Sequence, residues 1–147
     1  MQDIHLPVPG LNDRIGKSID RFLEKLVPGK IVQRFNWGLF DDPALHQPEG
    51  HRISRIAQPN ITRENVGEQI FFRVEKQTLQ RLPSGSDILF TIRIFNTPLR
   101  EIADDPVKAA RLSHTLQTMP DAMLKYKSVS QYETLIFDYL NIWFLGM

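Results

Sequence analysis

The sequence has 147 residues, of which 41% are hydrophobic and 24% are charged, and its formal net charge is +1. This composition predicts a single globular domain, residues 1–147, and excludes a disordered chain. The small net charge argues against a nucleic-acid partner, and the lack of cysteine excludes disulfides, thiolate metal ligands and a cysteine nucleophile. The N-terminus lacks a secretion-signal pattern and the apolar tail is too short to span a bilayer, so we expect a cytoplasmic protein with no membrane partner.

The first predicted elements are a helix and a strand. Asn12 can cap a helix that Pro28-Gly29 ends. Residues 31–40 alternate between apolar and polar side chains, which predicts a strand. Residues 41–68 form a long polar connection, a kind of loop that is often functional. The apolar face of the helix carries Ile15, Ile19, Phe22, Leu23 and Leu26.

The central prediction is a β-hairpin over residues 71–95. Apolar and polar residues alternate on both sides of Pro83-Ser84-Gly85, which has the composition of a three-residue hairpin loop. That loop places Leu82 opposite Ser86, and counting outward places Glu75 opposite Arg93. This polar face is either a solvated surface with an ordinary Glu–Arg pair or the lining of a pocket. Its members are Arg73, Glu75, Gln77, Thr91 and Arg93.

Three helices are predicted after the hairpin. Thr97 followed by Pro98 predicts a short helix, and Asp105 followed by Pro106 predicts a longer one. A last helix begins near Ser130. The order of elements predicts an α+β domain in which helices pack on one side of an antiparallel sheet.

Several blocks of the sequence resemble one protein family. Residues 73–83 read RVEKQTLQRLP and residues 88–93 read ILFTIR. Together these blocks resemble the haem-dependent oxidative N-demethylase family. Shorter blocks agree in order, from about residue 4 to about residue 140: IHLPVPG at 4–10, SIDRF at 18–22, RFNW at 34–37 and YK at 126–127.

The resemblance implies a fold, an activity and partners. It implies a PAS-like sheet that holds haem, and oxidation of an N-methyl group of a small, dimethylamine-like secondary amine with release of formaldehyde. Electrons then come from NADPH through the flavin of a partner chain, a reductase subunit, so a hetero-oligomer is expected. Family members carry a segment before the IHLPVPG block, so we expect this chain to correspond to the C-terminal portion of the family domain.

Histidines are the candidate axial ligands of haem iron because the chain has no cysteine. The resemblance favours His5, which lies in the IHLPVPG block, although a surface role for this histidine stays open. His46 and His51 lie in the long polar connection, where their spacing is only a weak metal-site signal. His114 lies beside the apolar stripe of a predicted helix, which is typical of a packing or surface residue.

Other residues of the family-like blocks are candidates for haem and substrate contacts. Arg34 and Arg73 can bind the haem propionates, or they serve in structural ion pairs. Trp37 either stacks on the haem or belongs to the core. Glu75, together with Gln77, can orient a cationic amine or accept its proton, unless Glu75 is occupied by an ion pair with Arg93.

A rival interpretation belongs to a different class of function. The chain could be a non-catalytic PAS-like module that binds a ligand or a protein and has lost the haem pocket. No nucleotide-binding, metalloprotease or serine-hydrolase motif offers a further alternative. A haem Soret band that depends on His5 would distinguish the two interpretations.

Overall fold

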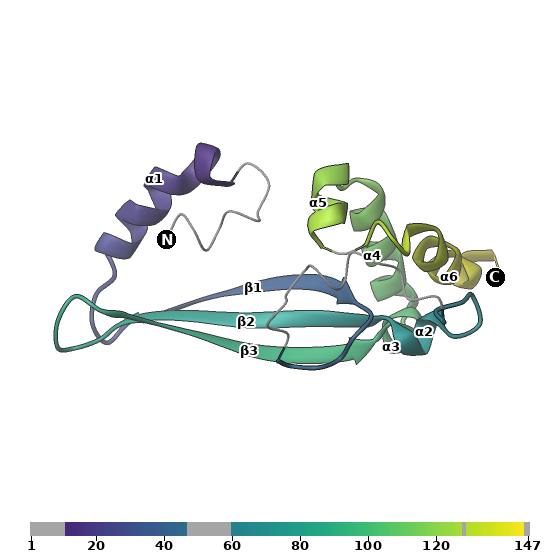
Figure 1. The fold of residues 1–147 in the computed structure, drawn as a ribbon, viewed down its shortest axis with the longest axis horizontal. Helices are drawn as coiled ribbons and strands as arrows, with labels where there is room; N and C mark the ends of the chain where they lie inside the picture. Colours follow the sequence, from purple (N-terminus) through teal and green to yellow (C-terminus); the bar gives the residue numbers. More distant parts are fainter. Residues whose placement is uncertain (1–10, 47–59, 128, 146–147) are drawn as a thin grey trace. The chain divides into compact units, whose positions relative to one another are not determined.

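The computed structural model describes residues 11–46, 60–127 and 129–145, with only the backbone at 11–16 and 142–145. Its three strands form one antiparallel sheet with the order β1-β2-β3 (Figure 1), which confirms the α+β class. The PAS-like topology stays a prediction. The elements are α1 Leu11–Glu24, β1 Ile31–Phe40, α2 Val66–Gln69, β2 Phe71–Arg81, β3 Ile88–Pro98, α3 Leu99–Ala103, α4 Pro106–Gln117, α5 Asp121–Tyr126 and α6 Glu133–Leu145.

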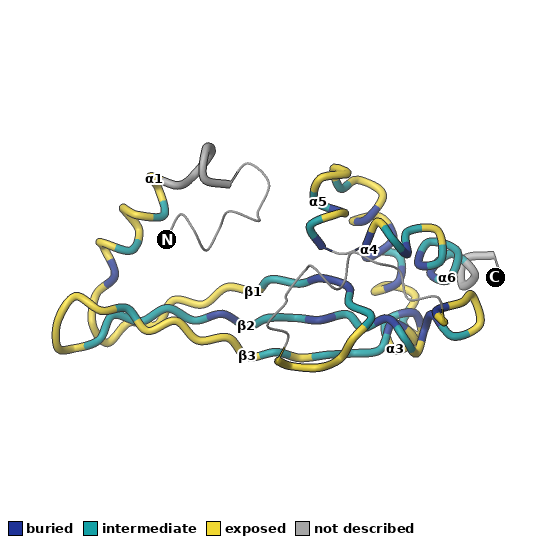
Figure 2. Tube along the Cα trace, viewed as in Figure 1, coloured by how far each residue is buried: buried dark blue, intermediate teal, exposed yellow. Residues whose placement is uncertain are grey.

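The chain forms two compact units, and each strand contributes residues to both. Unit 1 contains residues 1–36 and 75–94, and unit 2 contains residues 37–74 and 95–147. Nearly all described core residues belong to unit 2, whereas Leu26 is the one buried apolar side chain described in unit 1. Figure 2 shows the same contrast as long exposed stretches of β1 and β3 within unit 1. A single domain over residues 1–147 stays a prediction.

Helix α4 shows how the sequence specifies unit 2. The Asp105 carboxylate caps the helix by accepting hydrogen bonds from the Val107 and Lys108 amides at 3.0 and 3.1 Å, and Pro106 takes the first helical position. Leu112 and Leu116 are buried against the core cluster, as their spacing predicts. Among the described helices, none is long and apolar enough to cross a membrane.

Some predicted element ends are wrong. Helix α3 is capped by Pro98 rather than Thr97, because β3 continues through Pro98, whose backbone is extended at φ −54° and ψ 142°. Helix α6 begins at Glu133 rather than near Ser130. Helices α2 and α5 were not predicted, because four and six residues are too few to show an apolar repeat.

The predicted hairpin register is wrong by one residue. The Leu82 amide donates to the Asp87 carbonyl at 3.0 Å, so the loop has four residues rather than three. The Thr78 and Thr91 hydroxyls, 2.6 Å apart, confirm the same register further along the hairpin. Gly85 does adopt the expected left-handed conformation, with φ +96°.

The corrected register changes which side chains share a face. Because successive residues of a strand point to opposite faces, a slip of one residue moves all of β3 relative to β2. Arg93 therefore lies on the face opposite to Glu75, and the predicted Glu75–Arg93 pair is wrong. The polar face predicted over both strands does not exist, since Thr91 and Arg93 lie on the other side of the sheet from Gln77.

Candidate functional site

Three predicted site residues form a hydrogen-bonded chain in unit 1. The Arg34 Nε donates to the Gln77 Oε1 at 2.6 Å, and the Gln77 Nε2 donates to the Glu75 Oε2 at 2.8 Å. The first bond determines the orientation of the Gln77 amide, so its NH₂ group faces Glu75. Gln77 is only 6% exposed, so this chain is anchored in the sheet rather than lying loosely on its surface.

Apolar side chains of β3 lie next to this polar chain. In the observed register, Ile92 is opposite Gln77 and Ile94 is opposite Glu75. Directly opposite residues in an antiparallel sheet have Cβ atoms about 5 Å apart. The Glu75 carboxylate therefore accepts from a neutral amide on the face that carries Ile92 and Ile94, an arrangement suited to a cation that carries small apolar substituents.

Trp37 lies in unit 2, where it contacts an aromatic ring and a lysine. Its ring stacks on Phe72, with centroids 5.4 Å apart and an angle of 28° between the planes. The Lys127 Nζ lies 4.4 Å from the centroid of the Trp37 ring and donates to the Trp37 carbonyl at 2.5 Å. Lys127 is 8% exposed, so this cation–π contact is largely desolvated and strong for its kind.

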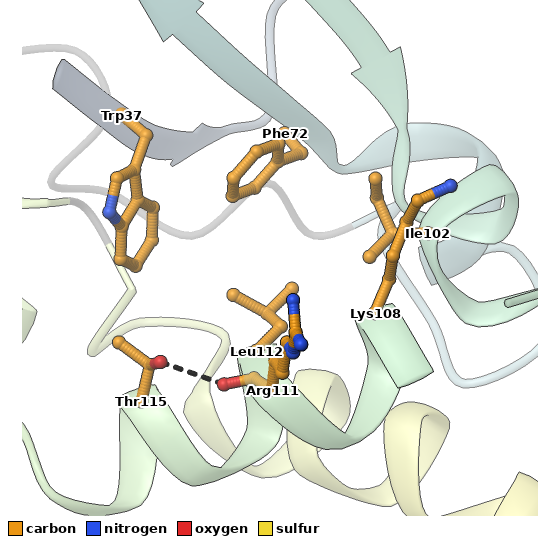
Figure 3. Close-up of a pocket in the computed structure, with 7 residues that line it drawn as sticks. All are labelled: Trp37, Phe72, Ile102, Lys108, Arg111, Leu112 and Thr115. Atoms are coloured by element: carbon orange, nitrogen blue, oxygen red, sulfur yellow. Dashed lines mark hydrogen bonds between the residues drawn. The ribbon is translucent and has the colours of Figure 1, made fainter. Parts of the chain in front are cut away.

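The Trp37–Phe72 pair forms one side of a pocket of about 250 Å³ in unit 2 (Figure 3). Helix α4 supplies the other side through residues spaced as on one helical face. Thr115 donates its hydroxyl proton to the Arg111 carbonyl at 2.7 Å. The pocket thus has an apolar interior and cationic side chains beside it. Its lining residues are Trp37, Phe72, Ile102, Lys108, Arg111, Leu112 and Thr115.

Arg73 is buried in unit 2, at 4% exposure, and holds the chain that follows β1. Its guanidinium lies 4.9 Å from the Phe40 ring centroid, and its Nη2 donates to the Ala44 carbonyl at 2.5 Å. The Asn96 amide donates to the adjacent Pro43 carbonyl at 2.7 Å. These bonds give Arg73 a structural role, whereas its predicted contact with a haem propionate stays a prediction.

The histidine predictions are only partly within the described residues. His5 and His51 lie outside them. His46 and His114 are described and both are exposed. Within the described residues, no cluster of three or more histidine, aspartate or glutamate side chains is arranged to hold a metal ion.

The comparison with known families decides the identity of the chain. Residues 1–137 match the model of the family described as haem-dependent oxidative N-demethylase, alpha subunit-like. The chain belongs to this family. The match confirms the family that the RVEKQTLQRLP block predicted. The family description supports a function related to haem-dependent oxidative N-demethylation, and its alpha-subunit wording implies a multi-subunit enzyme.

The described pocket of this N-demethylase family member does not fit a haem. Pockets that enclose drug-sized ligands have roughly 300–1,000 Å³, and a porphyrin is larger than such ligands. The pocket holds about 250 Å³, and none of its lining residues is a histidine, cysteine, methionine or tyrosine, the usual axial ligands. A complete haem site therefore requires more than the residues around this pocket.

Sequence reasoning missed two features of the sites. Lys127 was noted as part of a family-like block but was given no role, because its long-range contact with Trp37 leaves no local signal. The contribution of α4 to the pocket was also missed. The spacing of Lys108, Arg111, Leu112 and Thr115 marks one face of the helix and could have indicated it.

Proposed function

We propose that this chain binds a small secondary amine, of the dimethylamine class, for haem-dependent oxidative N-demethylation. The observation that carries this proposal is the family match over residues 1–137. The surroundings of Glu75 support it, because its hydrogen-bond partner Gln77 is neutral and leaves the negative charge for a cationic ligand. A dimethylammonium ion would direct an N–H group to Glu75 and its methyl groups to Ile92 and Ile94.

The proposed reaction removes one methyl group from the amine as formaldehyde. One atom of O₂ enters the formaldehyde and the other leaves as water, while two electrons and two protons are consumed. The electrons come from NADPH through the flavin of a reductase subunit in a hetero-oligomer. Haem, bound at a site other than the described pocket, would supply oxygen activation. Glu75 accepts one proton from the ammonium group at a carboxylate oxygen, because the neutral amine is the more readily oxidised form.

Gln77 and Arg34 act on the amine through Glu75 in this proposal. Gln77 positions the carboxylate, and Arg34 determines the orientation of the Gln77 amide. Haem contacts from His5, Arg34, Trp37 and Arg73 stay predictions of the family resemblance.

The substitution Glu75→Gln tests the amine site in the enzyme assembled with its partner subunits. It keeps the side chain's shape and removes its charge. A hydrogen bond to a charged group contributes about 1.5–3 kcal/mol, so we expect KM for dimethylamine to rise roughly 10- to 150-fold. The measurement is formaldehyde release against amine concentration, supported by calorimetric titration of the dimethylammonium ion.

A matched control separates this effect from the change in net charge. Glu64 is an exposed carboxylate of unit 2, so Glu64→Gln removes the same charge and should leave KM unchanged. An unchanged KM in Glu75→Gln would contradict the role of Glu75. If the unsubstituted assembly released no formaldehyde from secondary amines, the proposed function itself would be wrong.

One observation favours the rival function, a non-catalytic PAS-like module that binds a ligand or a protein. The described pocket is too small for haem. Expression with haem supplied tests this rival directly. A folded protein without a Soret band supports it, whereas a Soret band that is lost in His5→Ala supports the oxidative function.

A further inference from the structure

Strand β3 is an edge of the sheet formed by the described strands, because the order is β1-β2-β3. The bonds from the Leu82 amide to the Asp87 carbonyl and from the Leu99 amide to the Ile70 carbonyl show which residues of β3 pair with β2. The residues of β3 that form hydrogen bonds with β2 are the odd-numbered ones. Since main-chain groups alternate along a strand, the amides and carbonyls of Ile88, Phe90 and Ile92 point away from β2.

This edge carries exposed apolar side chains in unit 1. Leu89, Phe90 and Ile92 are 45–48% exposed. Natural proteins usually protect an edge strand with charges, prolines or bulges. Between residues 88 and 94 the only charged residue is Arg93, and there is no proline. A strand with these properties is suited to pair with another strand.

We propose that β3 pairs antiparallel with β3 of a second copy of this chain, centred on Phe90. The main chain restricts the register, because only the even-numbered residues present hydrogen-bonding groups at this edge. Phe90 then lies opposite Phe90 of the second copy, and Ile88 lies opposite Ile92. These three positions bury Ile88, Phe90 and Ile92 of the two copies against each other on one face of the sheet, whereas Leu89 lies on the other face.

Charge complementarity selects this register among those that the main chain allows. With Phe90 at the centre, Asp87 lies opposite Arg93 of the second copy, and the two-fold axis repeats the pair. Both are non-hydrogen-bonded positions, where side chains on opposite strands come closest. In a register centred on Ile92, Arg93 lies opposite Thr91 of the second copy. In a register centred on Thr91, Arg93 lies opposite Leu89 of the second copy. A centre at Phe90 thus brings the two charged residues of 87–94, which have opposite signs, face to face across the interface.

The proposal rests on the main-chain groups and charges of β3 and does not depend on the amine site, although Ile92 contributes to both. Glu75 and Gln77 lie on β2, away from the paired edge. The dimer would extend the sheet of unit 1 from three strands to six.

A charge exchange tests the pairing with the full chain. Asp87→Arg and Arg93→Asp each place like charges opposite each other at two symmetric positions, so we expect the dimer Kd to rise about tenfold or more. The double variant Asp87→Arg/Arg93→Asp restores opposite charges and should return Kd to within about threefold of the unsubstituted value. The measurement is sedimentation equilibrium with native mass spectrometry, and circular dichroism verifies folding.

A second pair of variants tests the apolar centre. Phe90→Lys places two lysines opposite each other and should abolish the dimer. Ile31→Lys is the matched control, because Ile31 is 63% exposed but lies on β1, and it should leave the dimer intact. A protein that is monomeric at all concentrations would overturn the proposal. So would a dimer that the charge exchange leaves unchanged, or a complex that forms only with a different polypeptide.

Discussion

Gly67 of α2 lies where no larger residue fits. A Cβ atom added at this position would lie 2.2 Å from the Tyr139 hydroxyl oxygen, far below the 3.0 Å that real Cβ contacts respect. Burial raises the pKa of Tyr139, and the nearby carboxylates of Asp104 and Glu68 add to this rise. The hydroxyl therefore stays neutral at physiological pH, packed against the main chain of α2.

The substitution Gly67→Ala should destabilise unit 2. Overpacking of this kind costs about 1–3 kcal/mol, because the Tyr139 ring or helix α2 must move. Urea denaturation measures the loss in the free energy of unfolding. The same substitution in a Tyr139→Ala background should cost much less, since the obstructing ring is gone. Equal costs in both backgrounds would mean that the close contact is not the cause.

A charged side chain, the Asp105 carboxylate, caps the N-terminus of helix α4. The Lys108 ammonium lies 3.0 Å from the Asp105 Oδ2, and this contact, together with the helix amides, lowers the pKa of Asp105 below its ordinary value of 3.8. A carboxyl group whose pKa is lowered by folding stabilises the folded state above the unfolded pKa. That contribution is lost as the pH falls through the folded pKa.

In the Asp105→Asn variant, the contribution of residue 105 to the free energy of unfolding should not depend on pH. Asparagine can cap the same amides without carrying a charge. Between pH 6 and pH 5 the difference in urea midpoint between the two proteins should be constant, and below about pH 4 it should shrink as Asp105 is protonated. Midpoints measured from pH 6 to pH 2 test this expectation. A difference that stays constant down to pH 2 would contradict it.

Elements with a strong local signal could be predicted from the sequence. Strand β1 occupies the predicted residues 31–40, and α4 begins at the predicted cap Asp105. The hairpin register could not be predicted, because Pro83-Ser84-Gly85 is compatible with a loop of three or four residues. The bond between the Leu82 amide and the Asp87 carbonyl and the Thr78–Thr91 contact distinguish them, and both join residues across the sheet.

Part of the candidate site could be predicted from the sequence. The chain through Arg34, Gln77 and Glu75 joins residues that the family-like blocks already marked. The neighbours Ile92 and Ile94 could not be predicted, since they follow from the register. Contacts such as that of Lys127 with Trp37 join residues 90 positions apart and leave no trace in local spacing.

At the scale of the whole molecule, the two units differ in how much core they contain. The described core cluster lies in unit 2 and draws residues from both α4 and α6. In the part of unit 1 that the structure describes, many apolar side chains of the sheet are exposed and Leu26 is the one buried apolar side chain. Local stability in a protein follows the density of buried contacts, so the units should open at different free energies.

Hydrogen exchange followed by mass spectrometry should reveal this difference. We expect amides of α4 and of residues 134–140 to exchange at least about tenfold more slowly than those of residues 75–81 and 88–94. The unsubstituted chain at low micromolar concentration is the sample, and the Phe90→Lys variant is the control for protection gained through dimerisation. Equal protection in the two units of that variant would contradict the expectation.

The four-residue turn has a consequence for how this family can diverge. Deleting a single residue between Pro83 and Ser86 would leave a three-residue loop and keep Leu82 opposite Asp87, so the loop could shorten without moving β3. A slip of the strand itself by one residue would instead turn Arg93 to the side of Glu75 and take Ile92 and Ile94 away from it. Recognition of a cation would then be lost without replacing any residue that contacts it.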